Sequence, residues 1–149
     1  MASLVIDDHL LRDVLVGERT PDIDGLVTDQ LATTGLWLFR LSASFADPSV
    51  LGKLSAPVAS LPDNLQATFR SQLVSLPPEI EVLPLRQLAW PMAELQRRHR
   101  TQGHRLSAAM VEALAAAHRL GAGIAVSTHD VGPNLRAAAE VDGIDFHIL

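Results

Sequence analysis

An apolar run that ends in two carboxylates stands at the start of this chain. Residues 4–6 (Leu-Val-Ile) are followed directly by Asp7 and Asp8. Three apolar residues without polar alternation favour a strand covered on both faces, although so short a run also fits a helix. Apolar residues then recur three and four apart over residues 10–15, which predicts a helix directly after the acids. Because ligand sites in open parallel sheets form at the carboxyl ends of strands, Asp7 is predicted to lie in such a site.

Helix and strand patterns alternate along the rest of the chain. This alternation predicts a single α/β domain over residues 1–149, with a mostly parallel central sheet of four to five strands and helices on both faces. The patterns predict helices at residues 26–32, 36–45, 107–120 and 133–140, and strands at residues 79–83, 123–127 and 144–148.

Composition excludes several classes of site. The chain has no cysteine, so disulfides, thiolate zinc sites and cysteine nucleophiles are ruled out. No stretch approaches the roughly 20 apolar residues that span a bilayer, and no basic region precedes the first apolar run. We therefore expect neither export nor membrane insertion, and a cytoplasmic protein. The formal charge of −5 disfavours broad electrostatic attraction to nucleic acid.

Basic residues nevertheless cluster in one stretch. Four of the twelve lysines and arginines lie within nine residues, as Arg97, Arg98, Arg100 and Arg105. This cluster fits an RNA-binding patch, but it fits better a solvated helix end at which cations complement the helix dipole. Aromatic residues for base stacking are absent nearby in the sequence, which disfavours sequence-specific recognition of single strands.

Several short motifs together resemble the PIN domain, the nuclease fold of VapC-type toxins. They are the strand that ends at Asp7, residues 106–107 (Leu-Ser), residues 112–114 (Glu-Ala-Leu), residues 120–122 (Leu-Gly-Ala) and residues 128–130 (Thr-His-Asp). The resemblance covers most of the chain as an order of elements. It implies a three-layer fold whose active site gathers carboxylates around Mg²⁺ or Mn²⁺. Such ions prefer oxygen ligands, and a metal-activated water promotes phosphodiester cleavage.

The first acid position of the family is occupied by an acid in this chain, and the second is not. Asp7 matches the first acid, whereas Arg40 stands where the second is expected. A cation repels a metal ion, so we expect Arg40 to alter the site by pairing with Asp7. Asp8 is either a first-turn acid that favours the helix dipole or a replacement metal ligand.

Two alignments remain open for the other two acids. If residues 120–122 fix the register, Met110 and Thr128 occupy these positions and both acids are lost. If residues 128–130 fix it, the acids are Glu112 and Asp130, eighteen residues apart. Met110 continues an apolar stripe, which favours the first alignment, whereas the spacing favours the second.

Three functions follow from these patterns. The first is a degenerate PIN-like protein, related to toxin–antitoxin systems, that binds RNA or an antitoxin-like partner, has little or no nuclease activity and forms a homodimer. The second is an active Mg²⁺- or Mn²⁺-dependent endoribonuclease. Its catalytic residues would be Asp7, Glu112 and Asp130, and its metal ligands Asp7, Asp8 and Asp130. The third is a protein-interaction module without nucleic acid, which fits the acidic charge.

Overall fold

Five parallel strands form one sheet, in the order β3-β2-β1-β4-β5, with β1 at its centre. The computed structural model of the protein describes residues 2–18, 28–47, 49, 52–129 and 132–149. Within these residues the strands are β1 (Ala2–Ile6), β2 (Thr28–Thr33), β3 (Ile80–Val82), β4 (Gly123–Val126) and β5 (Phe146–Ile148). The predicted α/β class, the parallel sheet and its size are therefore confirmed.

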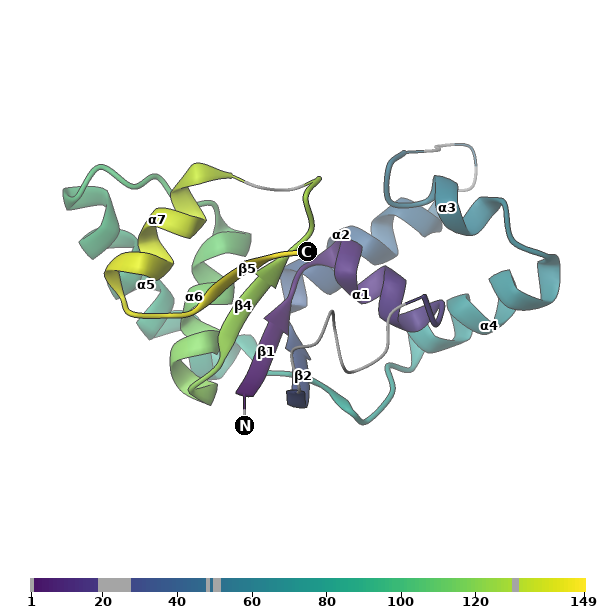
Figure 1. Ribbon diagram of the computed structural model, residues 1–149, viewed down its shortest axis with the longest axis horizontal. Coiled ribbons are helices and arrows are strands. Elements are labelled where there is room, and N and C mark those ends of the chain that lie inside the picture. The colour runs from purple at the N-terminus through teal and green to yellow at the C-terminus, as the bar shows by residue number, and fades with distance from the viewer. Residues whose placement is uncertain (1, 19–27, 48, 50–51, 130–131) are drawn as a thin grey trace.

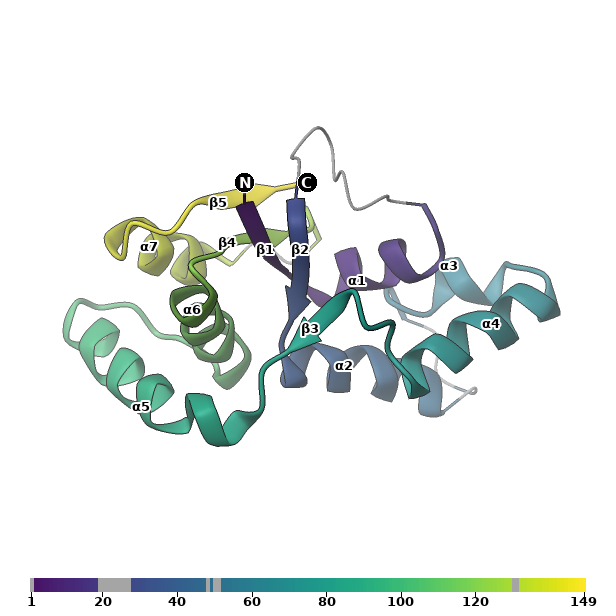
Figure 2. The same ribbon diagram turned by 90° about the horizontal axis from the view of Figure 1, so that it is seen from below.

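Helices cover both faces of this sheet (Figures 1 and 2). One layer contains α1 (Asp8–Leu15), α2 (Gly35–Ala46), α3 (Ala56–Ala59) and α4 (Asp63–Val74). The other contains α5 (Leu85–Thr101), α6 (Ala108–Leu120) and α7 (Pro133–Val141). The arrangement is consistent with a PIN-like three-layer fold. None of the helices in the described ranges is long and apolar enough to cross a lipid bilayer.

Alternate side chains of β1 enter two separate apolar cores. Val5 packs with residues of α6 and α7 on one face of the sheet. Leu4 and Ile6 pack on the other face with Leu10 and Leu11 of α1. All five side chains are essentially fully buried. The side-chain period of two in a strand and burial on both faces explain the uninterrupted apolar run at the start of the sequence.

The helix expected at residues 26–32 is wrong over its described part. The backbone from Thr28 to Thr33 is strand β2, which pairs with β1 on one side and β3 on the other. Residues 26 and 27 lie outside the described residues. Pairing on both sides satisfies the backbone donors and acceptors of β2, and this long-range effect outweighs the weak helical pattern. The strand is also tied to its neighbour by a side chain, since Thr33 Oγ1 donates to Ile6 O at 2.8 Å.

Candidate functional site

The carboxyl ends of β1, β2 and β4 meet at one edge of the sheet. Asp7 follows β1, Thr34 follows β2 and Ser127 follows β4. Because the three strands are parallel neighbours, polar side chains from distant parts of the sequence gather there. This edge is where the sequence predicted the site.

Asp7 connects three elements at this edge. Its side chain is fully buried and caps the N-terminus of α1. Oδ1 accepts a hydrogen bond from Leu10 N at 2.9 Å, and Oδ2 accepts one from Ser127 N at 2.9 Å. Its own N–H donates to Ala125 O at 3.2 Å. The predicted position at the tip of β1 is therefore confirmed, and both carboxylate oxygens bind backbone N–H groups of the protein.

Glu112 caps a helix that it does not belong to. It lies in α6 and is 1% exposed. Its Oε2 accepts from Gly35 N and its Oε1 from Leu36 N, both at 2.9 Å. These N–H groups open α2, and Thr34 Oγ1 accepts the N–H of Trp37 beside them. The negative charge also complements the positive end of the α2 dipole, so Glu112 stabilises the start of α2.

Arg40 lies against the second carboxylate of the N-terminal pair. Its Nε is 3.3 Å from Asp8 Oδ2, and Asp8 is fully buried whereas the arginine side chain is about half exposed. The ion pair thus involves Asp8, one residue beyond the expected partner Asp7. Asp8 also accepts the N–H of His9 through Oδ1 at 2.9 Å. A guanidinium at this position places a positive charge where the family resemblance implies a metal ligand.

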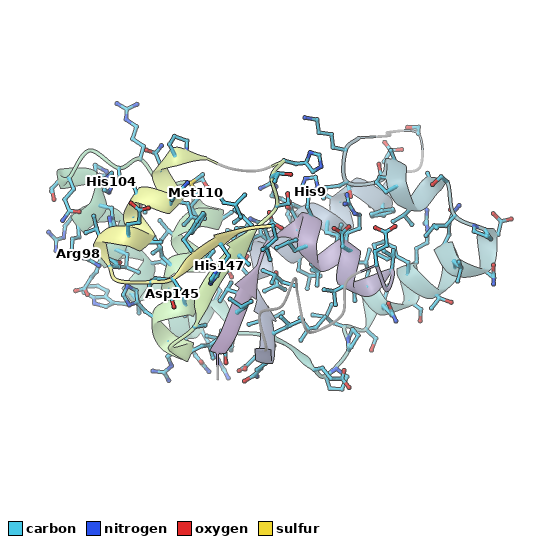
Figure 3. All side chains as sticks on the ribbon, in the orientation of Figure 1. His9, Arg98, His104, Met110, Asp145 and His147 are labelled. Atoms are coloured by element: carbon cyan, nitrogen blue, oxygen red, sulfur yellow. The ribbon has the colours of Figure 1, made fainter. Side chains whose placement is uncertain are left out.

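Two histidines that the sequence did not single out as a pair face each other at the same edge. The rings of His9 and His129 stack with centroids 5.3 Å apart. Arg12 Nη1 lies 3.4 Å from His9 Nδ1 and also donates to Lys53 O at 3.0 Å. His9 follows the two acids and is visible near this edge in Figure 3. The sequence did carry a signal for this pair. His9 comes shortly after the end of β1, and His129 comes shortly after the end of β4.

The remaining predicted site residues do not resolve the alignment. Met110 of α6, labelled in Figure 3, packs partly buried against the core that contains Val5. A Cβ at Gly132 would lie 3.2 Å from its Cε. Thr128 is exposed and its N–H donates to Leu149 O at 3.2 Å. Asp130 lies outside the described residues, so its metal role stays a prediction. No group of three or more metal-binding side chains is found among the residues that are described.

The predicted basic patch separates into two parts. Arg97, Arg100 and Arg105 are exposed, whereas Arg98 is only partly exposed. Arg98 binds Asp142 with both terminal nitrogens, at 2.6 and 3.0 Å. Its charge is therefore neutralised within the fold. The other three arginines form no ion pair with any described residue and are available to bind an anion.

Asp142 is the centre of a polar cluster that joins α5, α6 and α7. Asp142 binds Arg98, and its Oδ2 also lies 3.1 Å from His99 Nε2 and 2.8 Å from His118 Nε2. Burial acts to raise the pKa of Asp142, but the hydrogen bonds from Arg98, His118 and His99 outweigh it and hold the pKa well below its usual value. The hydrogen bond to Asp142 raises the pKa of Arg98. His99 is fully buried and its Nδ1 is 3.3 Å from His104 Nδ1.

The sequence did not predict this cluster. Its members come from three helices, and only the concentration of arginine and histidine at the end of α5 was visible as a signal. Figure 3 places Arg98 and His104 on the α5 side of the molecule, away from His9. The cluster lies apart from the carboxyl edge of the sheet.

Fold and site together define an α/β protein with an all-parallel sheet. At the carboxyl edge of that sheet, Asp7 and Glu112 bind backbone N–H groups and an arginine contacts Asp8. No protein-family model matches the sequence, and comparison with curated proteins gives no match.

Proposed function

We propose that the protein is a PIN-like domain with a degenerate acidic site that binds RNA and has little or no nuclease activity. It acts in the cytoplasm, in a toxin–antitoxin or related regulatory setting. The observation that carries the proposal is that both oxygens of Asp7 and both oxygens of Glu112 accept backbone N–H groups. These two acids stabilise the starts of α1 and α2.

The charge beside them supports the same conclusion. A metal ion at this edge would have to approach Arg40, whose guanidinium lies 3.3 Å from Asp8. Like charges repel strongly where water is excluded, and Asp8 is fully buried. Phosphodiester cleavage by a bound metal requires a coordination site with room for water and substrate. The arrangement therefore favours a domain that does not bind a metal ion at this edge and has the fixed positive charge of Arg40 there instead.

Support for RNA as the ligand comes from the exposed arginines near the end of α5. Arg100 and Arg105 line a surface pocket of about 380 Å³ with Gln96, His104 and Leu106. Arg97 lines a second pocket of about 350 Å³ that shares α5 as a wall. Guanidinium groups bind phosphate through paired hydrogen bonds, so three of them over a short surface suit a phosphate backbone.

The test is the affinity for a fluorescent single-stranded RNA measured by anisotropy in EDTA over a series of salt concentrations. We expect log Kobs to fall linearly with log salt, by roughly 0.7 for each phosphate contact on a single strand. The double variant Arg100→Gln/Arg105→Gln should bind more weakly and show a shallower slope. Arg136→Gln is the matched control, because this exposed arginine lies on α7, where it pairs with Glu140.

Two results would contradict the proposal. Absence of RNA binding at low salt would remove RNA as the ligand. Cleavage of the RNA after addition of Mn²⁺, lost in Asp7→Asn, would instead establish the metal-dependent ribonuclease that uses Asp7, Glu112 and Asp130.

A protein partner is the second candidate, and one surface favours it. α2 and α4 form a pocket of about 430 Å³ lined by Phe45, Leu73 and Val74 together with Ser42, Ala46 and Arg70. Val74, the last residue of α4, is 90% exposed. An antitoxin-like protein or a second copy of the chain could cover this surface. Sedimentation velocity over a range of concentrations would detect self-association, which Val74→Asp should weaken.

A further inference from the structure

One tryptophan of this chain lies in water. The chain has two tryptophans, and Trp37 is 3% exposed whereas Trp90 is 73% exposed. A tryptophan is one of the largest apolar side chains, and exposing it forgoes a large gain from burial. Trp90 therefore calls for a reason other than packing.

Trp90 stands on the outer face of α5. Figure 2 shows α6 between α5 and β4, so one side of α5 faces away from the molecule. The inner side is formed by the buried residues Leu88, Leu95 and His99. With 3.6 residues per turn, four residues fall within a sector of about 80° on the opposite side of α5. They are Arg86, Trp90, Arg97 and Arg100. All four side chains are exposed.

These four residues form a stripe along α5 that only the small exposed side chain of Ala93 interrupts, between Trp90 and Arg97. At 1.5 Å per residue, Arg86 and Arg100 are about 21 Å apart along the helix, and Trp90 is one turn from Arg86. Glu94 is the exposed carboxylate at the edge of the stripe. None of Arg86, Arg97 and Arg100 forms an ion pair with a described residue. Three positive charges, none of them in an ion pair with a described residue, thus lie along α5 on either side of an exposed indole.

We propose that this outer face of α5 binds single-stranded RNA, with one base stacked on the indole of Trp90 and flanking phosphates bound by Arg86, Arg97 and Arg100. Aromatic platforms beside basic groups are the common means of binding single strands, because every base has a π face and every nucleotide a phosphate. A duplex keeps its bases stacked inside and offers none to Trp90. The inference rests on the proposed RNA-binding function and deepens it by naming the strand form and the stacking residue.

The helix period explains why no aromatic residue was expected beside the arginine cluster. Trp90 is seven residues before Arg97, so it is remote from the arginine cluster along the chain. Seven residues are almost two full turns, which returns both side chains to the same face of α5. The absence of a nearby aromatic in the sequence therefore did not mean its absence from the surface.

The charge of this face favours RNA over an apolar protein surface as its occupant. The single aromatic ring lies between Arg86 on one side and Arg97 and Arg100 on the other, so a strand whose base stacks on Trp90 can extend its flanking phosphates toward arginines in both directions. An apolar protein surface would leave their charges desolvated and unpaired, at a high cost in free energy.

Tryptophan fluorescence tests the proposal in the intact protein. Iodide should quench Trp90 in the free protein and leave the buried Trp37 unaffected. Addition of single-stranded RNA should quench the Trp90 emission and protect it from iodide. Trp90→Phe retains only Trp37, so its emission should not change when RNA is added. A duplex of two complementary strands of the same length, which has no loop, is the control ligand.

The variants give the quantitative result. Trp90→Ala should weaken single-strand binding by about 5-fold to 100-fold, the range for loss of one stacked base, whereas Trp90→Phe should retain most of the affinity. Phe39→Ala is the matched control, because Phe39 is 66% exposed on α2, in the other helix layer. It should leave RNA affinity unchanged.

The outcomes separate this inference from the proposed function. If Trp90→Ala and Arg86→Gln leave the RNA affinity unchanged, the outer face of α5 is not the binding surface. The proposal that the protein binds RNA would still stand. Equal, Trp90-independent affinity for duplex and single strand would overturn the α5 surface as well. No RNA binding by the unaltered protein would overturn both proposals.

Discussion

Glu112 on α6 and Gly35 at the start of α2 are joined by a hydrogen bond of 2.9 Å across 77 positions of sequence. A Cβ on residue 35 would lie 3.3 Å from Glu112 Oε2, so a glycine allows this close approach. The second oxygen of the same carboxylate accepts the N–H of Leu36. A residue that one of the two alignments with the family makes catalytic therefore stabilises a helix terminus.

Glu112→Gln is expected to destabilise the fold. Glutamine keeps the size of the side chain but removes its charge. Its NH2 group would face one of the two N–H donors of α2, where a carboxylate oxygen now accepts a hydrogen bond. We expect the free energy of unfolding to fall by about 2 kcal/mol, within the roughly 1.5–3 kcal/mol of a hydrogen bond to a charged group. Urea denaturation measures this, and Glu140→Gln is the control, because the Glu140 side chain is exposed on α7. Unchanged stability would show that the cap contributes nothing.

Two substitutions of Asp7 should distinguish the contributions of its two hydrogen bonds to stability. Asp7→Ala loses both the cap of α1 and the acceptor for Ser127 N, whereas Asp7→Asn keeps an oxygen that can cap Leu10 N. An N-cap is worth about 1 kcal/mol, so Asp7→Ala should be the less stable variant by about that amount. The midpoints of thermal unfolding measure the order. Equal midpoints would contradict the capping role.

Arg40→Ala should destabilise the protein by removing the cation beside buried Asp8. The loss should be about 1–2 kcal/mol, between the roughly 0.2–1 kcal/mol of exposed pairs and the roughly 3–5 kcal/mol of fully buried ones, because the arginine is half exposed. Arg40→Lys keeps the charge and should recover part of it. Denaturation in urea is the measurement, and an Arg40→Ala variant as stable as the parent would rule out a stabilising pair.

Asp142 predicts a dependence of stability on pH. Its pKa is held below the usual value, chiefly by Arg98, His118 and His99 acting against burial. In the unfolded chain an aspartate titrates near pH 3.9, so the stabilisation is complete above about pH 4 and is lost as the pH falls toward the folded-state pKa. Asp142→Asn should therefore cost stability at pH 7, and its difference from the parent should shrink below about pH 4. A difference that is constant from pH 7 to pH 3 would contradict this assignment.

Sequence patterns predicted the fold where the information is local. The apolar run of β1 and the acid at its tip depend on residues that are adjacent in sequence, and the structure has both as expected. Strand β2 was missed because the pairing that makes it a strand comes from β1 and β3.

The site was predictable in place but not in role. Sheet topology placed Asp7 at the carboxyl edge, yet nothing in the sequence says that its partners are N–H groups of α1 and of Ser127. The capping by Glu112 and the cluster around Asp142 depend on contacts between helices that are distant in sequence. The outer stripe of α5 was in principle visible from the 3.6-residue period, and it needed the exposed face of that helix to be known.

The most direct test of the central claim is a calorimetric titration of Mn²⁺ into the intact protein at neutral pH. The acids of the sheet edge stabilise the fold, so we predict no saturable heat at millimolar Mn²⁺, and no rise in the midpoint of thermal unfolding, which any ion bound only by the folded state would cause. Saturable binding of one ion that is abolished in Asp7→Asn would contradict the account and establish a working metal site.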